Sequence, residues 1–173
     1  QRPQWFACSD SSGPPLGSSG VDGLSTALDD RLWAVMADFS LAAYSSSFSA
    51  YNNVIAQPGE SLAGSWTALP LVVEGAALVD GVYTKFNAAA LVARSGNSAV
   101  ISFRGTDDLI DGIEDVLTMV PSAVHLQPLM LAFDQYVAAQ GISKVYVTGH
   151  SLGGALAQLY MMMHADTAAT RYE

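Results

Sequence analysis

The chain has 173 residues, of which half are apolar, and sixteen Asp and Glu outnumber seven Lys and Arg to give a net charge of −9 at pH 7. This length is sufficient for one globular domain with a buried core. The negative charge argues against nucleic acid and anionic membrane surfaces as partners, so any contact with lipid is expected to be apolar. No apolar run reaches the roughly 18 residues that a membrane-spanning helix needs.

The N-terminal part of the sequence predicts an extended arm followed by one domain. Residues 1–20 are rich in Ser, Gly and Pro and lack periodicity, whereas residues 21–173 contain the predicted helices and strands. The chain begins at Gln1 without a basic start and an apolar run, so a secretory signal has been removed or was never present. Cys8 is the single cysteine, which leaves either a free thiol or a bond to another segment, and no cysteine-rich metal site.

The first predicted helix runs to about Tyr44, and strands follow a polar loop at 45–64. Thr26 and Asp29 resemble a capping box at the start of this helix. Apolar residues then recur at helical spacing, at Leu28, Leu32, Met36, Phe39 and Ala43. Short apolar runs predict four strands, at 71–73, 77–79, 90–93 and 100–103. The turn Ser95-Gly96-Asn97-Ser98 indicates that the last two of these strands form an antiparallel pair.

Two further helices with a strand between them complete the pattern. Pro128 is expected to open the first of these helices and Gly141 to close it. Its apolar positions are Leu126, Met130, Phe133 and Val137. Residues 145–147 then predict a buried strand, followed at Gly149 by a turn into the last helix. Helices that alternate with strands in this way are typical of an α/β sheet with parallel members.

The sequence Gly149-His150-Ser151-Leu152-Gly153 fits the G-x-S-x-G pattern of a nucleophile elbow and lies between a predicted strand and a predicted helix. A serine on so tight a turn occupies a strained backbone position, and the flanking glycines prevent clashes between the elements. The N-terminus of the helix favours negative charge that develops on a bound carbonyl oxygen. We therefore expect Ser151 to be a catalytic nucleophile. The alternative is an ordinary glycine-rich turn.

A hydrolase elbow needs a second oxyanion donor from a loop after an earlier strand, and residues 103–106, Phe-Arg-Gly-Thr, provide a candidate. With the elbow motif further along the chain and the helix end Ala-Ala-Tyr at 42–44, these residues resemble the class 3 lipases, the family of the fungal triacylglycerol lipases. The resemblance covers about 29–164. It implies an α/β-hydrolase fold, of which this chain is the N-terminal part.

The resemblance also implies an activity and its residues. It implies a secreted serine ester hydrolase that cleaves triacylglycerol through an acyl-enzyme, without a metal or other cofactor. Thr106 is expected to supply oxyanion contacts through its N–H and hydroxyl, and Leu152 through its N–H. The alternative for Thr106 is a simple turn residue.

Residues 107–121 lie where the resemblance places a lid that meets the lipid–water interface. Their apolar residues fall on one helical stripe with acids opposite: Leu109, Ile110, Ile113, Val116, Leu117 and Val120. The alternative is a surface helix that packs permanently on the core. Asp115 matches a family aspartate that hydrogen-bonds the oxyanion threonine, and it is otherwise a solvated acid.

The triad is incomplete in this sequence. In such hydrolases the acid and then the histidine follow the nucleophile on loops after further strands, but the elbow helix is expected to use the residues after Ser151. Among the histidines, His125 precedes the nucleophile, His150 is expected to pack under the turn, and His164 is expected on the helix surface. We therefore expect this chain to be inactive alone and to need a C-terminal fragment as partner.

The sequence is also compatible with two other functions. The same fold could act on phospholipid, galactolipid or feruloyl esters, which the lid and the pocket would decide. A hydrolase scaffold without its triad could instead be a lipid-binding or interaction module. An Asp and a His after further strands would favour the enzyme.

Overall fold

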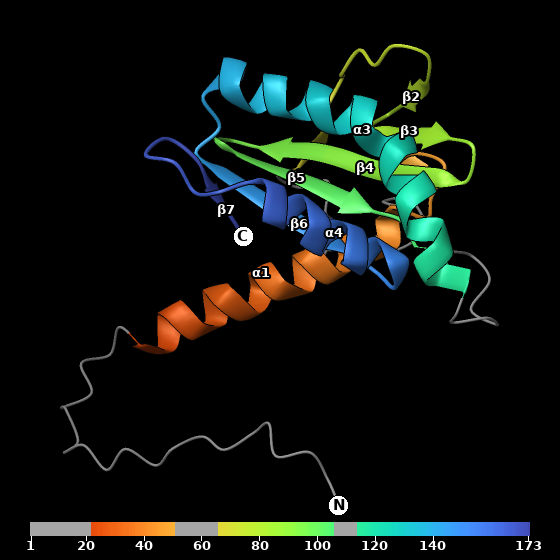
Figure 1. Ribbon diagram of the computed structural model, residues 1–173. Helices are drawn as coiled ribbons and strands as arrows, with labels where there is room; N and C mark the ends of the chain where they lie inside the picture. Colours follow the sequence, from red (N-terminus) through yellow and green to blue (C-terminus); the bar gives the residue numbers. More distant parts are fainter. Residues whose placement is uncertain (1–21, 51–65, 106–113) are drawn as a thin grey trace, which may run out of the picture.

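The computed structural model describes residues 22–50, 66–105 and 114–173 of the chain (Figure 1). Its helices and strands in chain order are α1 (Asp22–Ala42), β1 (Thr67–Ala68), β2 (Ala77–Val79), β3 (Val82–Lys85), β4 (Ala88–Ser95), β5 (Ser98–Phe103), α3 (Glu114–Gln140), β6 (Lys144–Gly149), α4 (Leu152–Met163) and β7 (Arg171–Tyr172). The predicted arm with Cys8, most of the predicted loop at 45–64, and Thr106 lie outside the described residues. No described helix has the length and apolarity to cross a membrane.

The strands form one mixed sheet in the order β2-β3-β4-β5-β6-β7, with β1 paired to β4. The pairs among β1 to β5 are antiparallel, whereas β5–β6 and β6–β7 are parallel. Helices α3 and α4 make the two crossover connections between the parallel strands, which a parallel pair requires. The predicted mixed sheet with flanking helices and the antiparallel pair around residues 95–98 are therefore confirmed.

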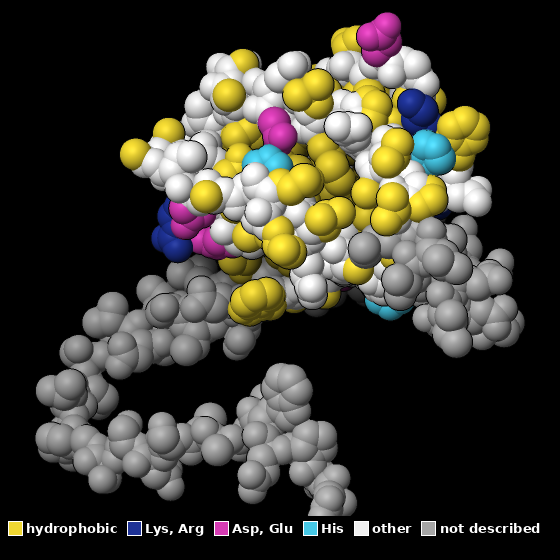
Figure 2. All heavy atoms as spheres, in the orientation of Figure 1, with side chains coloured by type: hydrophobic (Ala, Val, Ile, Leu, Met, Phe, Trp, Pro, Cys, Tyr) yellow, Lys and Arg dark blue, Asp and Glu magenta, His cyan; other side chains and the backbone are white. Residues whose placement is uncertain are grey.

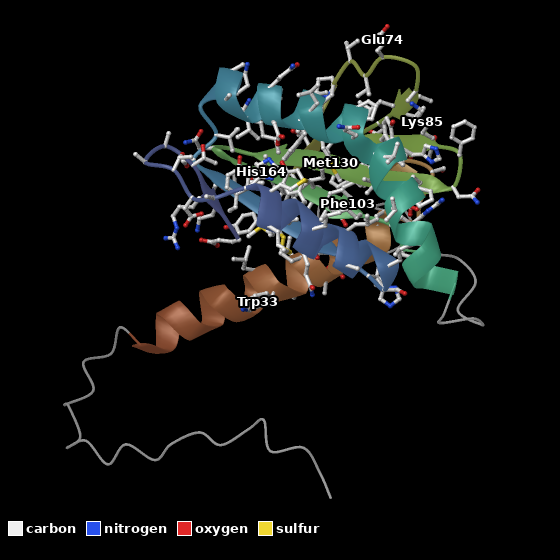
Figure 3. All side chains as sticks on the ribbon, viewed as in Figure 1. Trp33, Glu74, Lys85, Phe103, Met130 and His164 are labelled. Atoms are coloured by element: carbon white, nitrogen blue, oxygen red, sulfur yellow. The ribbon has the colours of Figure 1, made fainter. Side chains whose placement is uncertain are left out.

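Helices cover both faces of the sheet, and alternate residues of the central strands pack on opposite sides (Figure 1). On one face Ile101 and Phe103 of β5 pack with α3 and α4, and on the other face Val100 packs with α1. This alternation arises because successive side chains of a strand point to opposite faces of the sheet. Phe103 and Met130 lie in the layer between the sheet and the two helices (Figure 3). Both sides of β5 are thus buried, which accounts for its continuous run of apolar residues.

Three local predictions are wrong. Helix α1 begins at Asp22, so Thr26 lies inside it. Residues 71–73 form no strand, and Val72 is 94% exposed. Pro128 lies in the middle of α3 instead of at its start. An internal proline costs a helix about 3 kcal/mol, and the apolar residues of α3 that pack against the sheet offset that cost.

Strand β3 was not predicted, although Asp80-Gly81 is a typical hairpin signal. Asp80 has φ 46° and Gly81 has φ 78°. Positive φ at two successive turn residues matches the twist of a two-residue hairpin, here between β2 and β3.

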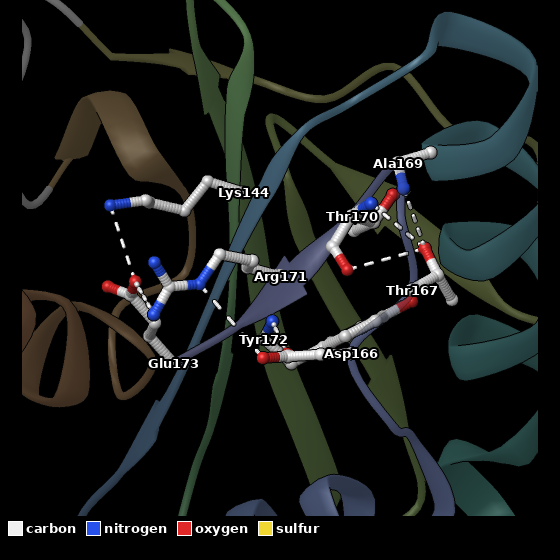
Figure 4. A network of polar contacts seen from close by, with 8 residues as sticks. All are labelled: Lys144, Asp166, Thr167, Ala169, Thr170, Arg171, Tyr172 and Glu173. Atoms are coloured by element: carbon white, nitrogen blue, oxygen red, sulfur yellow. Dashed lines mark hydrogen bonds and ion pairs between the residues drawn. The ribbon is translucent and has the colours of Figure 1, made fainter.

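Strand β7 corrects the expectation that the elbow helix uses every residue after Ser151. Helix α4 ends at Met163, and a turn at Thr167 to Thr170 returns the chain to pair with β6 (Figure 4). The backbone of Glu173 continues this pairing, because its N–H donates to Val145 at 2.8 Å and its carbonyl accepts from Val147 at 2.7 Å. The Glu173 carboxylate lies 3.3 Å from Lys144, but such an exposed ion pair contributes little.

Two hydroxyl groups fix α1 to the sheet. The buried Ser102 hydroxyl donates to the carbonyl of Phe39 at 2.8 Å, and the Thr148 hydroxyl donates to the carbonyl of Met36 at 3.2 Å. Ser102 and Thr148 are register partners on the parallel strands β5 and β6. Two adjacent residues on neighbouring strands, Ser102 and Thr148, therefore both bind α1.

We predict that Thr148→Val lowers the free energy of unfolding by about 1 kcal/mol, because the substitution removes the hydrogen bond to α1 at similar volume. Urea denaturation of the protein as its gene encodes it measures this loss. Thr84→Val is the matched control, since Thr84 is exposed on β3 and a surface change there should stay within about 0.5 kcal/mol. Equal losses in the two variants would contradict the role of the Thr148 hydroxyl.

Candidate active site

The two motifs singled out in the sequence meet at one edge of the sheet. Strands β5 and β6 run parallel, and their last residues, Phe103 and Gly149, are register partners. The chain leaves β5 through Arg104 and Gly105 and leaves β6 through His150 and Ser151. The carboxyl ends of neighbouring parallel strands thereby place Gly105 beside the elbow. Thr106, the next residue, lies outside the described residues.

Ser151 occupies a backbone conformation that side chains rarely adopt. Its φ is 57° and its ψ is −125°, at the N-cap of α4. A non-glycine residue held in such a sparsely populated region costs of order 1–3 kcal/mol. The residue is exposed, and its side chain makes no capping hydrogen bond to the helix. The strained turn thus presents a hydroxyl at the surface that does not serve to stabilise α4.

Glycines at the elbow allow the backbone of β5 to approach it closely. A Cβ on Gly149 would lie 2.9 Å from the Phe103 carbonyl oxygen and would also overlap the carbonyl of Gly153. A Cβ on Gly153 would lie 2.7 Å from the Phe103 carbonyl carbon and would overlap its oxygen. Real Cβ atoms essentially never make contacts below 3.0 Å. The steric reason that the sequence predicted for these two glycines is therefore confirmed.

The first turn of α4 leaves the backbone N–H of Leu152 without an acceptor among the described residues. The N–H of Gly153 donates to the carbonyl of His150 at 2.9 Å, and that of Gly154 to the carbonyl of Ser151 at 2.8 Å. Leu152 is the first residue of α4, so its N–H has no intrahelical acceptor. No described residue outside the helix accepts it either. The N–H of Leu152 thus has no acceptor among the described residues, and its role as an oxyanion donor stays a prediction.

The sequence model of the Mbeg1-like family matches residues 72–171, more than half of the chain. The chain belongs to the Mbeg1-like family. The matched region contains Ser151 and the strands and helices around it. No curated protein and no solved structure is significantly similar to the chain.

None of the histidines of this Mbeg1-like chain hydrogen-bonds Ser151 within the described ranges. His150 was expected to pack under the turn, but it is exposed, and its Nδ1 lies 3.2 Å from the hydroxyl of Tyr44. The ring of His125 lies 4.8 Å from that of Phe86.

His164 lies at the far end of α4 and not on the open helix surface that was expected. It is about 20 Å along the helix from Ser151 at 1.5 Å per residue, and its side chain is only 18% exposed. Nε2 lies 3.0 Å from the Asp134 carboxylate, and Nδ1 lies 2.8 Å from the Tyr160 carbonyl. The Tyr160 hydroxyl also donates a hydrogen bond to Asp134. The pKa of Tyr160 is raised, mainly because the hydroxyl is buried and further because of this hydrogen bond. These contacts connect α4 to α3, so they are structural.

The structure describes only part of the predicted lid. Residues 107–113 lie outside the described residues, whereas 114–121 form the first turns of α3. The side chain of Asp115 is also outside them, so its contact with Thr106 stays a prediction. No cluster of three or more metal-binding side chains occurs in residues 22–50, 66–105 and 114–173.

From the sequence, Tyr44 is expected only as the end of a helix. The structure places its hydroxyl at the site, where it accepts a hydrogen bond from the N–H of Gly105 at 3.1 Å. The signal that could have found this contact is not local, because Tyr44 and Gly105 lie far apart in the chain.

We predict that Gly153→Ala lowers the free energy of unfolding by about 3 kcal/mol or prevents folding, because the new methyl group overlaps the Phe103 carbonyl. Gly154→Ala is the matched control on the same helix. A Cβ there meets Gly149 only at 3.3 Å, and alanine has the better helix propensity. Its effect should stay within about 1 kcal/mol. Thermal unfolding followed by circular dichroism compares the two, and equal stability would show that the close approach is not required.

Proposed function

We propose that Ser151 is the nucleophile of a serine ester hydrolase of the class 3 lipase type, built on an α/β-hydrolase fold. The observation that carries the proposal is the strained, exposed serine at the turn from β6 to α4. Proteins retain such strain where it serves a function, and a strand–serine–helix turn is the setting in which a nucleophile elbow works.

The proposed chemistry begins when the Ser151 Oγ attacks the ester carbonyl carbon and its proton passes to a base. The resulting oxyanion accepts hydrogen bonds from the N–H of Leu152 and from Thr106. Collapse of the intermediate breaks the ester bond, and the base returns the proton to the departing alcohol. Water then attacks the acyl-enzyme in the same way and releases the fatty acid. Each oxyanion donor contributes about 3 kcal/mol of transition-state stabilisation.

We place the acid and the base of the triad in a C-terminal segment beyond the residues of this sequence. Contacts of the described histidines support this placement, because His164 is bound to Asp134 and the Nδ1 of His150 to Tyr44. Strand β7 is a further parallel strand after the elbow helix. A catalytic residue that follows such a strand would lie at the same sheet edge as Ser151, since parallel strands end at a common edge.

An apolar surface supports a lipid ester as the substrate. Val120, Val124 and Leu131 fall on one side of α3, and each is more than half exposed. Apolar side chains also spread over the neighbouring helix α4 (Figure 2), which has no charged residue and ends in the exposed Met162 and Met163. A helix of a water-soluble surface normally carries charges on its outer face. We propose that this face meets the lipid–water interface together with the predicted lid, and that the enzyme is secreted.

We predict that a fluorophosphonate probe forms an adduct on Ser151 in the protein as its gene encodes it, because the probe phosphonylates an activated serine. Peptide mass spectrometry locates the adduct. Ser151→Ala should abolish labelling, and Ser46→Ala, at an exposed serine outside the elbow, should leave it unchanged. No adduct on Ser151 would overturn the enzyme proposal and favour a lipid-binding or interaction module.

The substrate class is tested separately with emulsified triacylglycerol, phospholipid, galactolipid and feruloyl esters as substrates. We expect the highest kcat/KM on triacylglycerol. A higher value on one of the other esters would overturn the triacylglycerol assignment while leaving the nucleophile in place.

We predict that Val124→Glu lowers the rate on emulsified triacylglycerol about tenfold, because burial of a valine side chain is worth about 1.5 kcal/mol. The rate on a soluble short-chain ester should stay within about twofold. Val79→Glu is the matched control, because Val79 is 58% exposed and Val124 is 59% exposed, but Val79 lies on β2. Equal effects of the two substitutions would argue against a lipid-facing role for α3.

A further inference from the structure

Tyr44 lies two residues after the end of α1, and its hydroxyl reaches the candidate site. The residues just before it, Ala42 and Ala43, are fully buried. Their small side chains let the helix end approach the sheet. The backbone N–H of Tyr44 donates to the carbonyl of Leu41 at 3.0 Å, which continues the turn at the end of the helix. The backbone of Tyr44 is therefore held in place by the end of the helix.

The hydroxyl groups on β5 and β6 determine where Tyr44 lies relative to the sheet. Ser102 binds the Phe39 carbonyl and Thr148 binds the Met36 carbonyl, both within the last two turns of α1. The same two strands end at Phe103 and Gly149, one residue further along the chain in each case. The position of Tyr44 is thus defined by the strands that also carry the two halves of the site.

The hydroxyl of Tyr44 contacts both of those halves. It accepts the N–H of Gly105 at 3.1 Å, and it lies 3.2 Å from Nδ1 of His150, the residue before Ser151. The rings of Tyr44 and His150 meet edge to face with centroids 6.0 Å apart. A Cβ on Gly105 would lie 2.6 Å from the Tyr44 oxygen and 3.1 Å from the Cβ of Ser151. Only a glycine fits between the tyrosine and the elbow.

We propose that Tyr44 is a positioning residue that sets the spacing between Gly105 and Ser151. The proposal rests on the proposed function, in which Thr106 supplies oxyanion contacts. Because the N–H of Gly105 is bound by Tyr44, it is not free to bind the substrate oxygen. Tyr44 acts through Gly105 and His150, the two residues of the site that its hydroxyl contacts.

A positioning role makes a different prediction from a purely stabilising one. Loss of a hydrogen bond that only stabilises the fold lowers the unfolding midpoint but leaves kcat unchanged in the folded enzyme. Loss of a bond that orients an oxyanion donor lowers kcat and leaves KM almost unchanged, because the interaction forms fully only in the transition state.

The matched control is Tyr136 on α3, another half-buried tyrosine. Its hydroxyl accepts a hydrogen bond from Nη1 of Arg94 on β4 at 2.9 Å. Tyr136→Phe removes a hydroxyl that accepts one N–H, whereas Tyr44→Phe removes a hydroxyl that accepts one N–H and also contacts His150. Both substitutions keep the aromatic ring, and both should lower the unfolding midpoint.

The test measures ester hydrolysis and amide hydrogen exchange in the protein as its gene encodes it. We expect Tyr44→Phe to lower kcat about tenfold with KM within about twofold, a smaller loss than the ~100-fold or more for a deleted oxyanion donor. The Gly105 amide should exchange faster in the same variant. Tyr136→Phe should change neither kcat nor this exchange rate.

Two results would overturn the proposal: a kcat for Tyr44→Phe equal to that of Tyr136→Phe, or an unchanged exchange rate at Gly105. If the wild-type protein hydrolyses no ester, the proposed function fails and the positioning role fails with it. In that case a faster Gly105 exchange would still establish the structural contact. A failure of the positioning role alone leaves wild-type hydrolysis and Ser151 labelling intact, so the two failures are distinguishable.

Discussion

The candidate site depends on one steric constraint, the close approach of the Phe103 carbonyl to the elbow that follows β6. No side chain fits between this carbonyl and Gly153 or Gly149. The approach follows from register, since Phe103 and Gly149 are paired at the ends of parallel strands and α4 begins at Leu152, three residues after Gly149. Ser151 has to make a sharp turn in this confined space, which accounts for its positive φ. Its strain is balanced by the packing of α4, whose Leu156 and Tyr160 are buried against the sheet.

The second half of the site is fixed by different means. Among the described residues, the segment after β5 is held by a side chain from just beyond α1, because the Tyr44 hydroxyl accepts the N–H of Gly105. Helix α1 is itself positioned by Ser102 and Thr148, whose hydroxyls bind its carbonyls. The elbow thus requires glycine at positions 149 and 153, whereas the segment after β5 is held by the side chain of Tyr44.

This difference explains how much the sequence could predict. Ser151, Gly149, Gly153 and Leu152 form one local motif, and the reason for each residue can be stated from its neighbours in the chain. Helix α4 and the hairpin of β4 and β5 were predicted for the same reason. The role of Tyr44 could not be predicted, because it arises only when α1 packs beneath β5 and β6. Pro128 inside α3 and the two-residue strand β7 were missed because tertiary packing and pairing with β6 outweigh local preference there.

The distribution of charge gives the last constraint on function. The chain has a net charge of −9, yet α4 carries no charged residue. Between Val116 and Gln140 of α3, Asp134 is the single acidic or basic residue other than histidine. Its carboxylate accepts a hydrogen bond from Tyr160 and lies 3.0 Å from Nε2 of His164. Acidic residues therefore lie mainly elsewhere on the chain and would repel anionic lipid, while the helical face offers apolar contact. Under the proposed function, this combination favours a neutral ester such as triacylglycerol over a negatively charged lipid.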